Sequence, residues 1–413
     1  MSAQPTFVVV GGGLAAAKLA EALRERDFDG TVIVVGAEEH LPYERPPLSK
    51  EYLAGKKSLA DATTQPASWY RDHHIDLRLG TTVTAVDPKA KTVTLPDGST
   101  LGYDKLALAT GSRSRRIDLP GATAEGVHYL RTVDDADAIL AMLDSASRLA
   151  VIGAGWIGLE VTAGARAKDV AVTVVESADV PLLGALGREM GQVFADLHTE
   201  HGVDFRFGAK IEEITTADGR ATGLRLGDGS TIEADAVLVG IGAAPNVELA
   251  REAGLDVDGG VLVTETLQTS DPDIVAVGDI ADQQHPVLKR RVRVEHWANA
   301  LNQPAVAAAT MLGHPTPYEN LPYFFTDQYD LGMEYVGLGG RDDRVVVRGD
   351  KAKREFVAFW LDAGNRVQAG MNVNVWDVTD TVKALITSGR AVDPDRLADP
   401  AVSLIDAVPR NDL

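Results

Sequence analysis

The chain has 413 residues, enough for two or three domains, and its 45 % hydrophobic and 24 % charged residues are typical of a globular protein. It contains no cysteine, which excludes disulfides, thiolate metal sites and any mechanism that uses a cysteine nucleophile or redox pair. A formal net charge of −20 argues against a nucleic-acid partner, because binding phosphates needs a basic surface. Because the chain lacks cysteine, redox chemistry would need a bound cofactor, and we expect no metal site.

The sequence also bears on location. No apolar run approaches the roughly 18 residues that cross a bilayer, and the first residues lack the cationic region and cleavage site of a signal peptide. We therefore expect a cytoplasmic protein.

The first motif stands in FVVVGGGLAAAKLAEALR. An apolar run over 7–10 leads into Gly11, Gly13 and Ala16, spaced as GxGxxA, and a helical pattern follows. A second apolar run over 31–35 ends in acidic residues. Strand, glycine turn, helix, strand and acid indicate a dinucleotide-binding unit, in which the glycines admit a pyrophosphate and the acid accepts from a ribose hydroxyl. This complete context disfavours the alternative of a chance glycine turn.

The next segment, LPYERPPLSK, combines two prolines with two cations. Pro46 and Pro47 cannot extend a sheet, and they favour a short helix that runs to Gly55. Arg45 and Lys50 stand on either side of the prolines. By residue type alone, both cations could be solvated surface charges.

The dinucleotide pattern returns in VIGAGWIGLE. Gly153, Gly155 and Gly158 are spaced as GxGxxG, and Glu176 stands at the end of the next apolar run. Two later segments, LPDGSTLGYDKLALATGS and LGDGSTIEADAVLVGIGA, each join an Asp-Gly hairpin signal to an apolar strand that ends in a glycine turn. We expect a small β-meander in each unit and two different nucleotides in the protein.

A third signal lies in TSDPDIVAVGDIAD. An apolar strand over 274–277 delivers Gly278 and Asp279 to a turn, where a carboxylate could accept from polyol hydroxyls. This segment follows the second unit but completes the first, so the first domain should be discontinuous. From about residue 321, four alternating strands precede a helical TDTVKALITSGR and predict an α+β C-terminal domain without a nucleotide motif.

Together GGGLAAAKLAEALR, LPYERPPLSK, LALATGS, HYLRTVDDA, VIGAGWIGLE, AVGDIA and FFTDQYD resemble a known family over essentially the whole chain. It is the FAD-dependent NAD(P)H:ferredoxin and rubredoxin reductase family of bacterial oxygenase systems, of the putidaredoxin reductase and biphenyl dioxygenase reductase type. The resemblance implies an α/β, glutathione-reductase-like, two-dinucleotide-binding flavoprotein with Rossmann-type FAD and NAD domains and a C-terminal α+β domain. The expected boundaries are 1–113 with 245–320 for FAD, 114–244 for NAD and 321–413 for the C-terminal domain.

The resemblance implies an activity as well. FAD is bound non-covalently, and electrons pass from NADH through FAD to a small iron–sulfur protein, a [2Fe–2S] or [3Fe–4S] ferredoxin, which supplies a cytochrome P450 or ring-hydroxylating oxygenase. A flavin suits this task because it links two-electron and one-electron chemistry. Glu176 would bind the adenine ribose and repel the 2′-phosphate of NADPH, and SADVPLL after it brings no cation, which favours NADH.

The resemblance carries over further residues, one by one. The expected catalytic residues are Lys50, near the flavin ring, and Glu160, facing nicotinamide and flavin. Because Ala37 replaces the family's usual aspartate, the ribose contact is expected at Glu38. For Glu160, compensation of a helix dipole is an equal alternative, and for Trp297 core packing is. The FAD contacts are Gly11, Gly13, Ala16, Glu38, Arg45, Lys50, Ala109, Arg131, Gly278, Asp279 and Trp297, and the NAD contacts are Gly153, Gly155, Gly158, Glu160, Glu176 and Gly242.

The sequence departs from the family at two further positions. Phe325 stands where tryptophan is common, which puts any tryptophan-specific role on the route to the partner in doubt, and Gly184 stands where relatives often carry arginine. An acidic ferredoxin would need a local basic patch on this acidic chain. KRRVR over 289–293 is the densest candidate and Arg113, Arg115 and Arg116 form a second, although either could be a solvated charge run.

Two other functions compete with ferredoxin reduction. An NADH oxidase, peroxidase or disulfide reductase on the same scaffold relies on a redox cysteine, which this chain lacks. A flavoprotein like apoptosis-inducing factor would instead bind a partner in response to NADH and reduce acceptors slowly.

Overall fold

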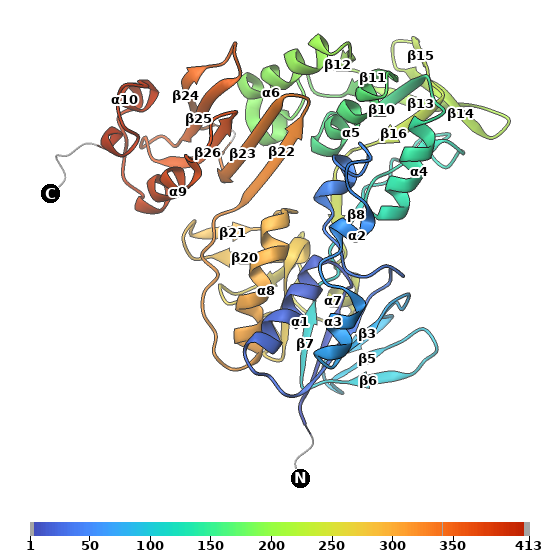
Figure 1. Cartoon of the computed structure of the whole chain (residues 1–413), viewed down its shortest axis with the longest axis vertical. Helices are drawn as coiled ribbons and strands as arrows, with labels where there is room; N and C mark the ends of the chain where they lie inside the picture. Colours follow the sequence, from blue (N-terminus) through green and yellow to red (C-terminus); the bar gives the residue numbers. More distant parts are fainter. Residues whose placement is uncertain (1–3, 341, 409–413) are drawn as a thin grey trace. The chain divides into compact units, whose positions relative to one another are not determined.

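The computed structural model describes residues 4–340 and 342–408 (Figure 1). The chain forms two compact units, each built from three separate segments. The first unit comprises Met1–Glu44, Leu59–Arg113 and Ala243–Pro322. The second unit comprises Arg45–Ser58, Ser114–Gly242 and Tyr323–Leu413. The short strands β8 (Ser112–Ser114) and β17 (Ala243–Pro245) lie at two of the points where the chain passes from one unit to the other.

A five-stranded parallel sheet in the order β19-β7-β1-β2-β3 forms the core of the first unit. Its central strands are buried on both faces, which explains why they read as continuous apolar runs rather than as alternating patterns. Helix α1 (Leu14–Glu25) follows the first strand and packs against α8 (Trp297–Met311) through small side chains. The strands are β1 (Thr6–Val10), β2 (Thr31–Val35), β3 (Ile75–Arg78), β7 (Lys105–Leu108) and β19 (Ile274–Ala276).

Smaller elements complete the first unit. The expected β-meander is confirmed as the antiparallel sheet β4-β5-β6, and a second small sheet has the order β18-β20-β21. The remaining helices are short. These elements are α2 (Leu59–Ala62), α3 (Ala67–Asp72), β4 (Ala85–Asp87), β5 (Thr92–Thr94), β6 (Thr100–Gly102), α7 (Glu248–Glu252), β18 (Val261–Val263), η2 (Gly278–Ile280), β20 (Ala281–His285) and β21 (Arg290–Val292).

The second unit contains a parallel sheet of the same kind, in the order β12-β11-β10-β16-β9, and its own meander β13-β14-β15. The repeated sequence pattern therefore corresponds to a repeated architecture. Its elements are η1 (Pro46–Ser49), β9 (Val127–His128), α4 (Val133–Leu143), β10 (Arg148–Ile152), α5 (Trp156–Ala167), β11 (Ala171–Glu176), α6 (Leu183–Glu200), β12 (Asp204–Phe207), β13 (Ile211–Ala217), β14 (Arg220–Leu226), β15 (Thr231–Glu233) and β16 (Ala236–Val239).

An antiparallel sheet in the order β22-β23-β26-β25-β24 also belongs to the second unit. Four of its strands match the predicted alternating segments. Strand β22 was not predicted, because the residues TDQ at its end are polar. The elements are β22 (Tyr323–Gln328), β23 (Leu331–Gly337), β24 (Arg344–Asp350), β25 (Glu355–Leu361), β26 (Val367–Val373), α9 (Thr379–Ser388), α10 (Pro394–Ala398) and η3 (Ile405–Ala407).

The segment with the paired prolines differs from the prediction. The helix is a single 3₁₀ turn, η1, with the prolines in its first positions, and the chain continues to Gly55 as a series of turns. The expected helix was therefore too long. Backbone bonds such as Tyr52 N to Pro47 O close these turns locally.

Candidate functional site

The first glycine turn joins β1 to α1. Gly11 has φ +131°, and a Cβ atom there would lie 2.1 Å from the carbonyl oxygen of Ala109, at the end of β7. At Gly12 a Cβ atom would come within 2.9 Å of the Cα of Gly36. The N-cap residue of α1, Gly13, has no side chain that could bond to the first helical N–H groups. The turn is therefore sterically closed to side chains, and no side chain caps the N–H groups at the start of α1, where an anion could bind.

The expected ribose acid of the first unit lies beyond this turn. Glu38 follows the end of β2 by three residues, and its Oε2 accepts a hydrogen bond of 2.5 Å from the Tyr43 hydroxyl. The carboxylate is therefore held by a side chain from its own loop.

The GDI segment forms the 3₁₀ turn η2 after β19. Asp279 is buried there, and Arg293 donates to its backbone carbonyl at 3.4 Å. The Gly278 N–H donates to Oε1 of Gln303, at 2.7 Å, and Gln303 comes from α8. Trp297 is the first residue of α8. Gln303 was missed by sequence reasoning because nothing in a helical pattern marks one inward-facing glutamine.

The second glycine turn, between β10 and α5, repeats the first. Gly153 has φ +95°, and a Cβ atom there would lie 2.6 Å from the carbonyl oxygen of Gly240. At Gly158 a Cβ atom would lie 2.4 Å from the carbonyl oxygen of Gly153, so only glycine fits the third position of this motif. Gly155, the N-cap residue of α5, again has no side chain that could cap the helix.

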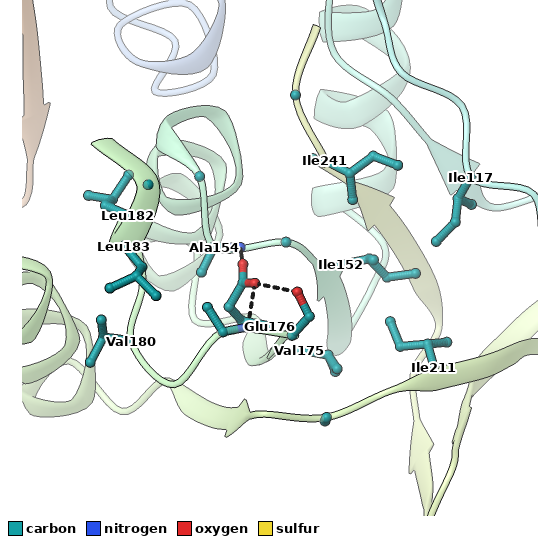
Figure 2. Close-up of a pocket in the computed structure, with 18 of the residues that line it drawn as sticks. Ile117, Ile152, Ala154, Val175, Glu176, Val180, Leu182, Leu183, Ile211 and Ile241 are labelled. Atoms are coloured by element: carbon teal, nitrogen blue, oxygen red, sulfur yellow. Dashed lines mark hydrogen bonds between the residues drawn. The ribbon is translucent and has the colours of Figure 1, made fainter. Parts of the chain in front are cut away.

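Glu176 ends β11 and bonds to the second turn itself. Its Oε2 accepts from the backbone N–H of Ala154 at 2.8 Å, and its Oε1 accepts from the backbone N–H of Ala178 at 2.9 Å and from the Ser177 hydroxyl at 3.0 Å. Figure 2 shows this carboxylate in the middle of a pocket. The acid is thus oriented by backbone groups before any ligand arrives.

The pocket around Glu176 has a volume of about 650 Å³, within the range of small-molecule sites. Isoleucines and leucines line two of its sides, and the glycine turn and Glu176 provide its polar part (Figure 2). Lys210 also lines the pocket. This cation lies outside SADVPLL, the segment after Glu176 in which the sequence shows no cation. Gly242 and Gly184 line it as well, with no side chain to fill it.

Lys50 and Glu160, the two expected catalytic residues, meet within the second unit. The Lys50 Nζ lies 3.3 Å from Glu160 Oε2, and the two side chains are 10 % and 5 % exposed. Ser49 donates to the same carboxylate oxygen, and the Thr326 hydroxyl donates to Oε1 at 2.6 Å. The Lys50 ammonium also lies 5.3 Å from the centre of the Phe325 ring. A buried carboxylate with this many hydrogen-bond donors is fixed in place, and it fixes the lysine beside it.

The contacts of Glu160 bear on the alternative that it only compensates the dipole of α5. Glu160 belongs to the fifth position of α5 and is buried against η1 and β22, so its bonds are to side chains of other elements. Compensation of the helix dipole does not account for this environment. Ser49 and Thr326 were missed by the sequence analysis, because they lie 111 and 166 residues away from Glu160 along the chain.

Arg45 and Arg131 are also brought together in the second unit. The Arg45 guanidinium donates to the backbone carbonyl of Arg131 at 2.5 Å. Arg131 precedes α4, whose N-terminus carries a capping box in which Thr132 and Asp135 bond reciprocally. Asp135 also accepts from the Arg131 N–H at 2.9 Å. The backbone that carries Arg131 is therefore fixed on both sides.

The two basic patches are partly used within the protein. Arg291 donates to the carbonyl of Asp282 at 2.7 Å and Arg293 pairs with Glu295 at 2.5 Å. Arg113 pairs with Glu248 at 2.8 Å, and the Arg116 guanidinium lies 3.9 Å from the centre of the Tyr129 ring. Lys289 and Arg290 are exposed.

Residues 4–340 and 342–408 contain no helix that is long and apolar enough to cross a membrane. Within the same ranges, no group of three or more His, Asp or Glu side chains is arranged so that it could hold a metal ion.

The geometry fits two dinucleotides. Each unit offers a glycine turn closed to side chains, a helix N-terminus without a side-chain cap and an acid near the end of the second strand. FAD and NAD share the ribose–pyrophosphate part that such a turn accepts. Architecture and turns together define a protein with two nucleotide-binding Rossmann-type units and an antiparallel C-terminal sheet.

The chain belongs to the pyridine nucleotide-disulphide oxidoreductase family, whose model matches residues 5–303, and a reductase C-terminal model matches 323–408. It is 45 % identical over 404 residues to the anthranilate 1,2-dioxygenase system ferredoxin–NAD(+) reductase component of Burkholderia cepacia, covering 98 % of this chain and 99 % of that one. It is 40 % identical over 406 residues to rhodocoxin reductase of Rhodococcus erythropolis, covering 98 % and 95 %.

A solved structure is similar over the same length. The covalent putidaredoxin reductase–putidaredoxin complex matches with a TM-score of 0.94 and 38 % identity, covering 98 % of this chain and 98 % of that chain. The expected fold class and the expected resemblance to ferredoxin reductases of oxygenase systems are confirmed.

Proposed function

We propose that this protein transfers electrons from NADH, through bound FAD, to a ferredoxin that supplies an oxygenase or a cytochrome P450. The observation that carries the proposal is the pair of glycine turns, each closed to side chains by a strand-end carbonyl. Relatives named as ferredoxin–NAD(+) reductase and rhodocoxin reductase, aligned over 98 % of the chain, support the same activity. When bound, FAD would accept two electrons at once and release them singly.

The roles of individual residues are part of the proposal. Lys50 and Glu160 form the catalytic pair. Glu160 fixes the lysine, and the lysine would supply positive charge near the flavin ring, which gains electron density when it is reduced. Residues for NAD are Gly153, Gly155, Gly158, Glu160, Glu176 and Gly242. Residues for FAD are Gly11, Gly13, Ala16, Glu38, Arg45, Lys50, Ala109, Arg131, Gly278, Asp279 and Trp297.

We assign FAD to residues 1–113 and 245–320, NAD to 114–244, and the C-terminal domain to 321–413. Changes of unit at 113/114 and 242/243 support the first two boundaries, and the reductase C-terminal match over 323–408 supports the third. We infer a cytoplasmic location, where NADH is supplied. The bonded carboxylate of Glu176 supports NADH over NADPH.

The test is reconstitution. Purified protein should carry FAD, and NADH should reduce [2Fe–2S], [3Fe–4S] and rubredoxin-type acceptors at rates that differ by orders of magnitude across the panel. Protein without flavin, or with equal slow rates for every acceptor, would contradict ferredoxin reduction. Stopped-flow reduction followed by ferredoxin-dependent cytochrome c reduction separates this activity from that of a flavoprotein like apoptosis-inducing factor, which would hold its electrons.

A further inference from the structure

Glu160 is the end of a longer hydrogen-bond chain that runs through the second unit. Thr326 donates to Glu160 Oε1 at 2.6 Å, and Gln328 Nε2 donates to the Thr326 hydroxyl oxygen at 3.1 Å. The His198 Nε2 lies 2.7 Å from Gln328 Oε1, and the Tyr329 hydroxyl lies 3.2 Å from His198 Nδ1. The first four of these side chains are at most 5 % exposed.

The chain has one direction, and the carboxylate sets it. An ionised Glu160 accepts only, so the Thr326 hydroxyl must donate and its oxygen is left to accept from the Gln328 amide nitrogen. Gln328 then presents its carbonyl oxygen to His198. That histidine must carry its proton on Nε2 and accept at Nδ1, from the tyrosine hydroxyl. Every donor therefore points toward Glu160.

Burial keeps the histidine in the form that this order requires. His198 is fully buried on α6, and burial lowers its pKa to about 4. A neutral ring has one donor and one acceptor, which is what Gln328 and Tyr329 need on its two sides. His201 stacks on the Tyr329 ring at 3.7 Å and covers the far end of the chain.

Packing alone does not explain these residue types. Phe324, Thr326 and Gln328 point to the same face of β22 because strand side chains alternate. Phe324 packs on Trp156 of α5, with ring centres 4.9 Å apart, so the same face accepts an apolar side chain. Burying polar groups on that face costs free energy unless each is bonded, and a connected network fixes the position of its end group.

We propose that Thr326, Gln328 and His198 are positioning residues, which hold the Glu160 carboxylate in one orientation and through it the Lys50 ammonium. Thr326 and Gln328 lie in the FFTDQYD segment that carries the family resemblance, but the resemblance assigned a role in the site to neither of them, nor to His198. The inference rests on the proposed function only in treating Lys50 and Glu160 as the catalytic pair.

The first experiment reads the chain without flavin. In ¹⁵N-histidine-labelled apoprotein, the ring nitrogens of His198 should show a single tautomer protonated at Nε2, at pH 7. Thr326→Val, nearly the same size, cuts the link to Glu160 and frees the Gln328 amide to turn over, so both tautomers should be populated. Thr326→Ser keeps the hydroxyl and should restore the single tautomer. A single tautomer in the valine variant would overturn the proposal.

The second experiment reads the catalytic pair in flavin-loaded protein. Loosening Lys50 removes positive charge from its fixed place, so Thr326→Val should make the flavin harder to reduce. We expect a threefold to tenfold change in the reduction equilibrium, about 15 to 30 mV for a two-electron couple. Thr326→Ser should lie close to wild type. In a Glu160→Gln background, the valine substitution should add nothing, since the chain acts through that carboxylate.

Equal shifts from Thr326→Val in both backgrounds would show that Thr326 does not act through Glu160, and would refute the proposal. If the valine variant does not fold, His198→Phe and Tyr329→Phe provide the same comparison from the other end, with a smaller expected shift for the tyrosine. An unchanged potential in a folded His198→Phe variant also refutes it. Failure of the wild-type protein to bind FAD would contradict the proposed function. The tautomer experiment on the apoprotein would then be the test of the hydrogen-bond chain.

Discussion

The two glycine turns have the same backbone and different neighbours. Gly11 donates to the carbonyl of Val35 at 2.8 Å, and Gly153 donates to that of Val175 at 2.9 Å, so the two motifs sit in the same register on their sheets. In this register Gly36 and Glu176 occupy equivalent places. In the second unit Glu176 occupies this place and bonds to the turn. In the first unit Gly36 occupies it and packs on the turn, and the acid, Glu38, follows two residues later.

The difference shows that one sequence motif can be supported in two ways. Glu176 is oriented by backbone N–H groups of the turn and of its own loop, which move little. Glu38 depends on the hydroxyl of Tyr43, a side chain from a loop. The two turns also differ at the third motif position. Gly158 leaves no room for a Cβ atom, whereas a buried alanine, Ala16, fits in the first turn. At the third motif position we therefore expect the second turn to be the less tolerant of substitution.

Alanine at the first glycine of each motif should have the largest effect and should separate the two nucleotides. Both positions have positive φ, and the new methyl group would meet a carbonyl oxygen at 2.1 Å for Gly11→Ala and 2.6 Å for Gly153→Ala. A cost of about 3 kcal/mol corresponds to roughly a 100-fold loss of affinity. Gly11→Ala should purify with little flavin. Gly153→Ala should keep its flavin and bind NADH about 100-fold more weakly in an absorbance titration. Equal flavin loss in both variants would contradict the assignment.

Acid should weaken the second unit through His198. Its pKa is about 4 in the folded state and about 6.5 when unfolded, so the unfolded state binds the extra proton between these values and stability falls as pH falls. Between pH 7 and pH 5 this group should remove about 2 kcal/mol of unfolding free energy. His198→Gln lacks this contribution, so urea unfolding at the two pH values should show a pH dependence about 2 kcal/mol smaller in the variant than in wild type. Burial also lowers the pKa of His128, His285 and His296, and these groups contribute to both proteins alike. A variant with the same pH dependence would disprove the assignment.

Removing each acid should test the two kinds of support at a smaller scale. Glu176→Ala frees the space of the 2′-phosphate, and we expect the ratio of kcat/KM for NADH over NADPH to fall roughly 10-fold to 100-fold. Lys210 lines the same pocket and would pair with the 2′-phosphate of NADPH in that variant. In the double variant Glu176→Ala with Lys210→Ala, the ratio of kcat/KM for NADH over NADPH should therefore fall less. Glu38→Ala is the matched control: FAD should dissociate a few-fold faster with no change in nucleotide preference. A wild type with equal kcat/KM values would sink the NADH assignment.

Charge reversal of the basic patches should have the smallest effect. Since Arg291 bonds to the backbone, Lys289→Glu with Arg290→Glu is the cleaner variant of KRRVR. If ferredoxin docks there, its KM should rise a few-fold at low salt and its salt dependence should flatten. Arg115→Glu with Arg116→Glu is the counterpart in the second unit. A pair of substitutions that changes neither the ferredoxin KM nor its salt dependence would show that those residues are not part of the docking surface.

Much of the fold could be predicted because local patterns decide it. Buried parallel strands read as apolar runs, the glycine spacings mark both turns, and the C-terminal strands alternate as half-buried strands should. Strand β22 was missed for a physical reason. Its last residues are polar, and a polar residue buried by a partner far along the chain looks the same in sequence as one exposed in a turn.

The site divides in the same way. The glycines of both turns follow from spacing alone, because no other residue tolerates the positive φ and the close carbonyl at Gly11 and Gly153. Lys50 and Glu160 could be named only through a family resemblance, since they are 110 residues apart in sequence. Ser49 and Thr326 carry no local signal, so the donors that hold Glu160 remained hidden.

The sequence by itself therefore determined the duplicated dinucleotide architecture, the two turns and the absence of cysteine chemistry. These depend on backbone conformation and composition, which neighbouring residues set. Only the tertiary structure decided that Glu176 is held by its turn while Glu38 is held by a tyrosine, and that a buried chain of donors ends on Glu160. Those features depend on which polar groups meet after the elements pack, and each buried polar group must then find a partner wherever the fold supplies one.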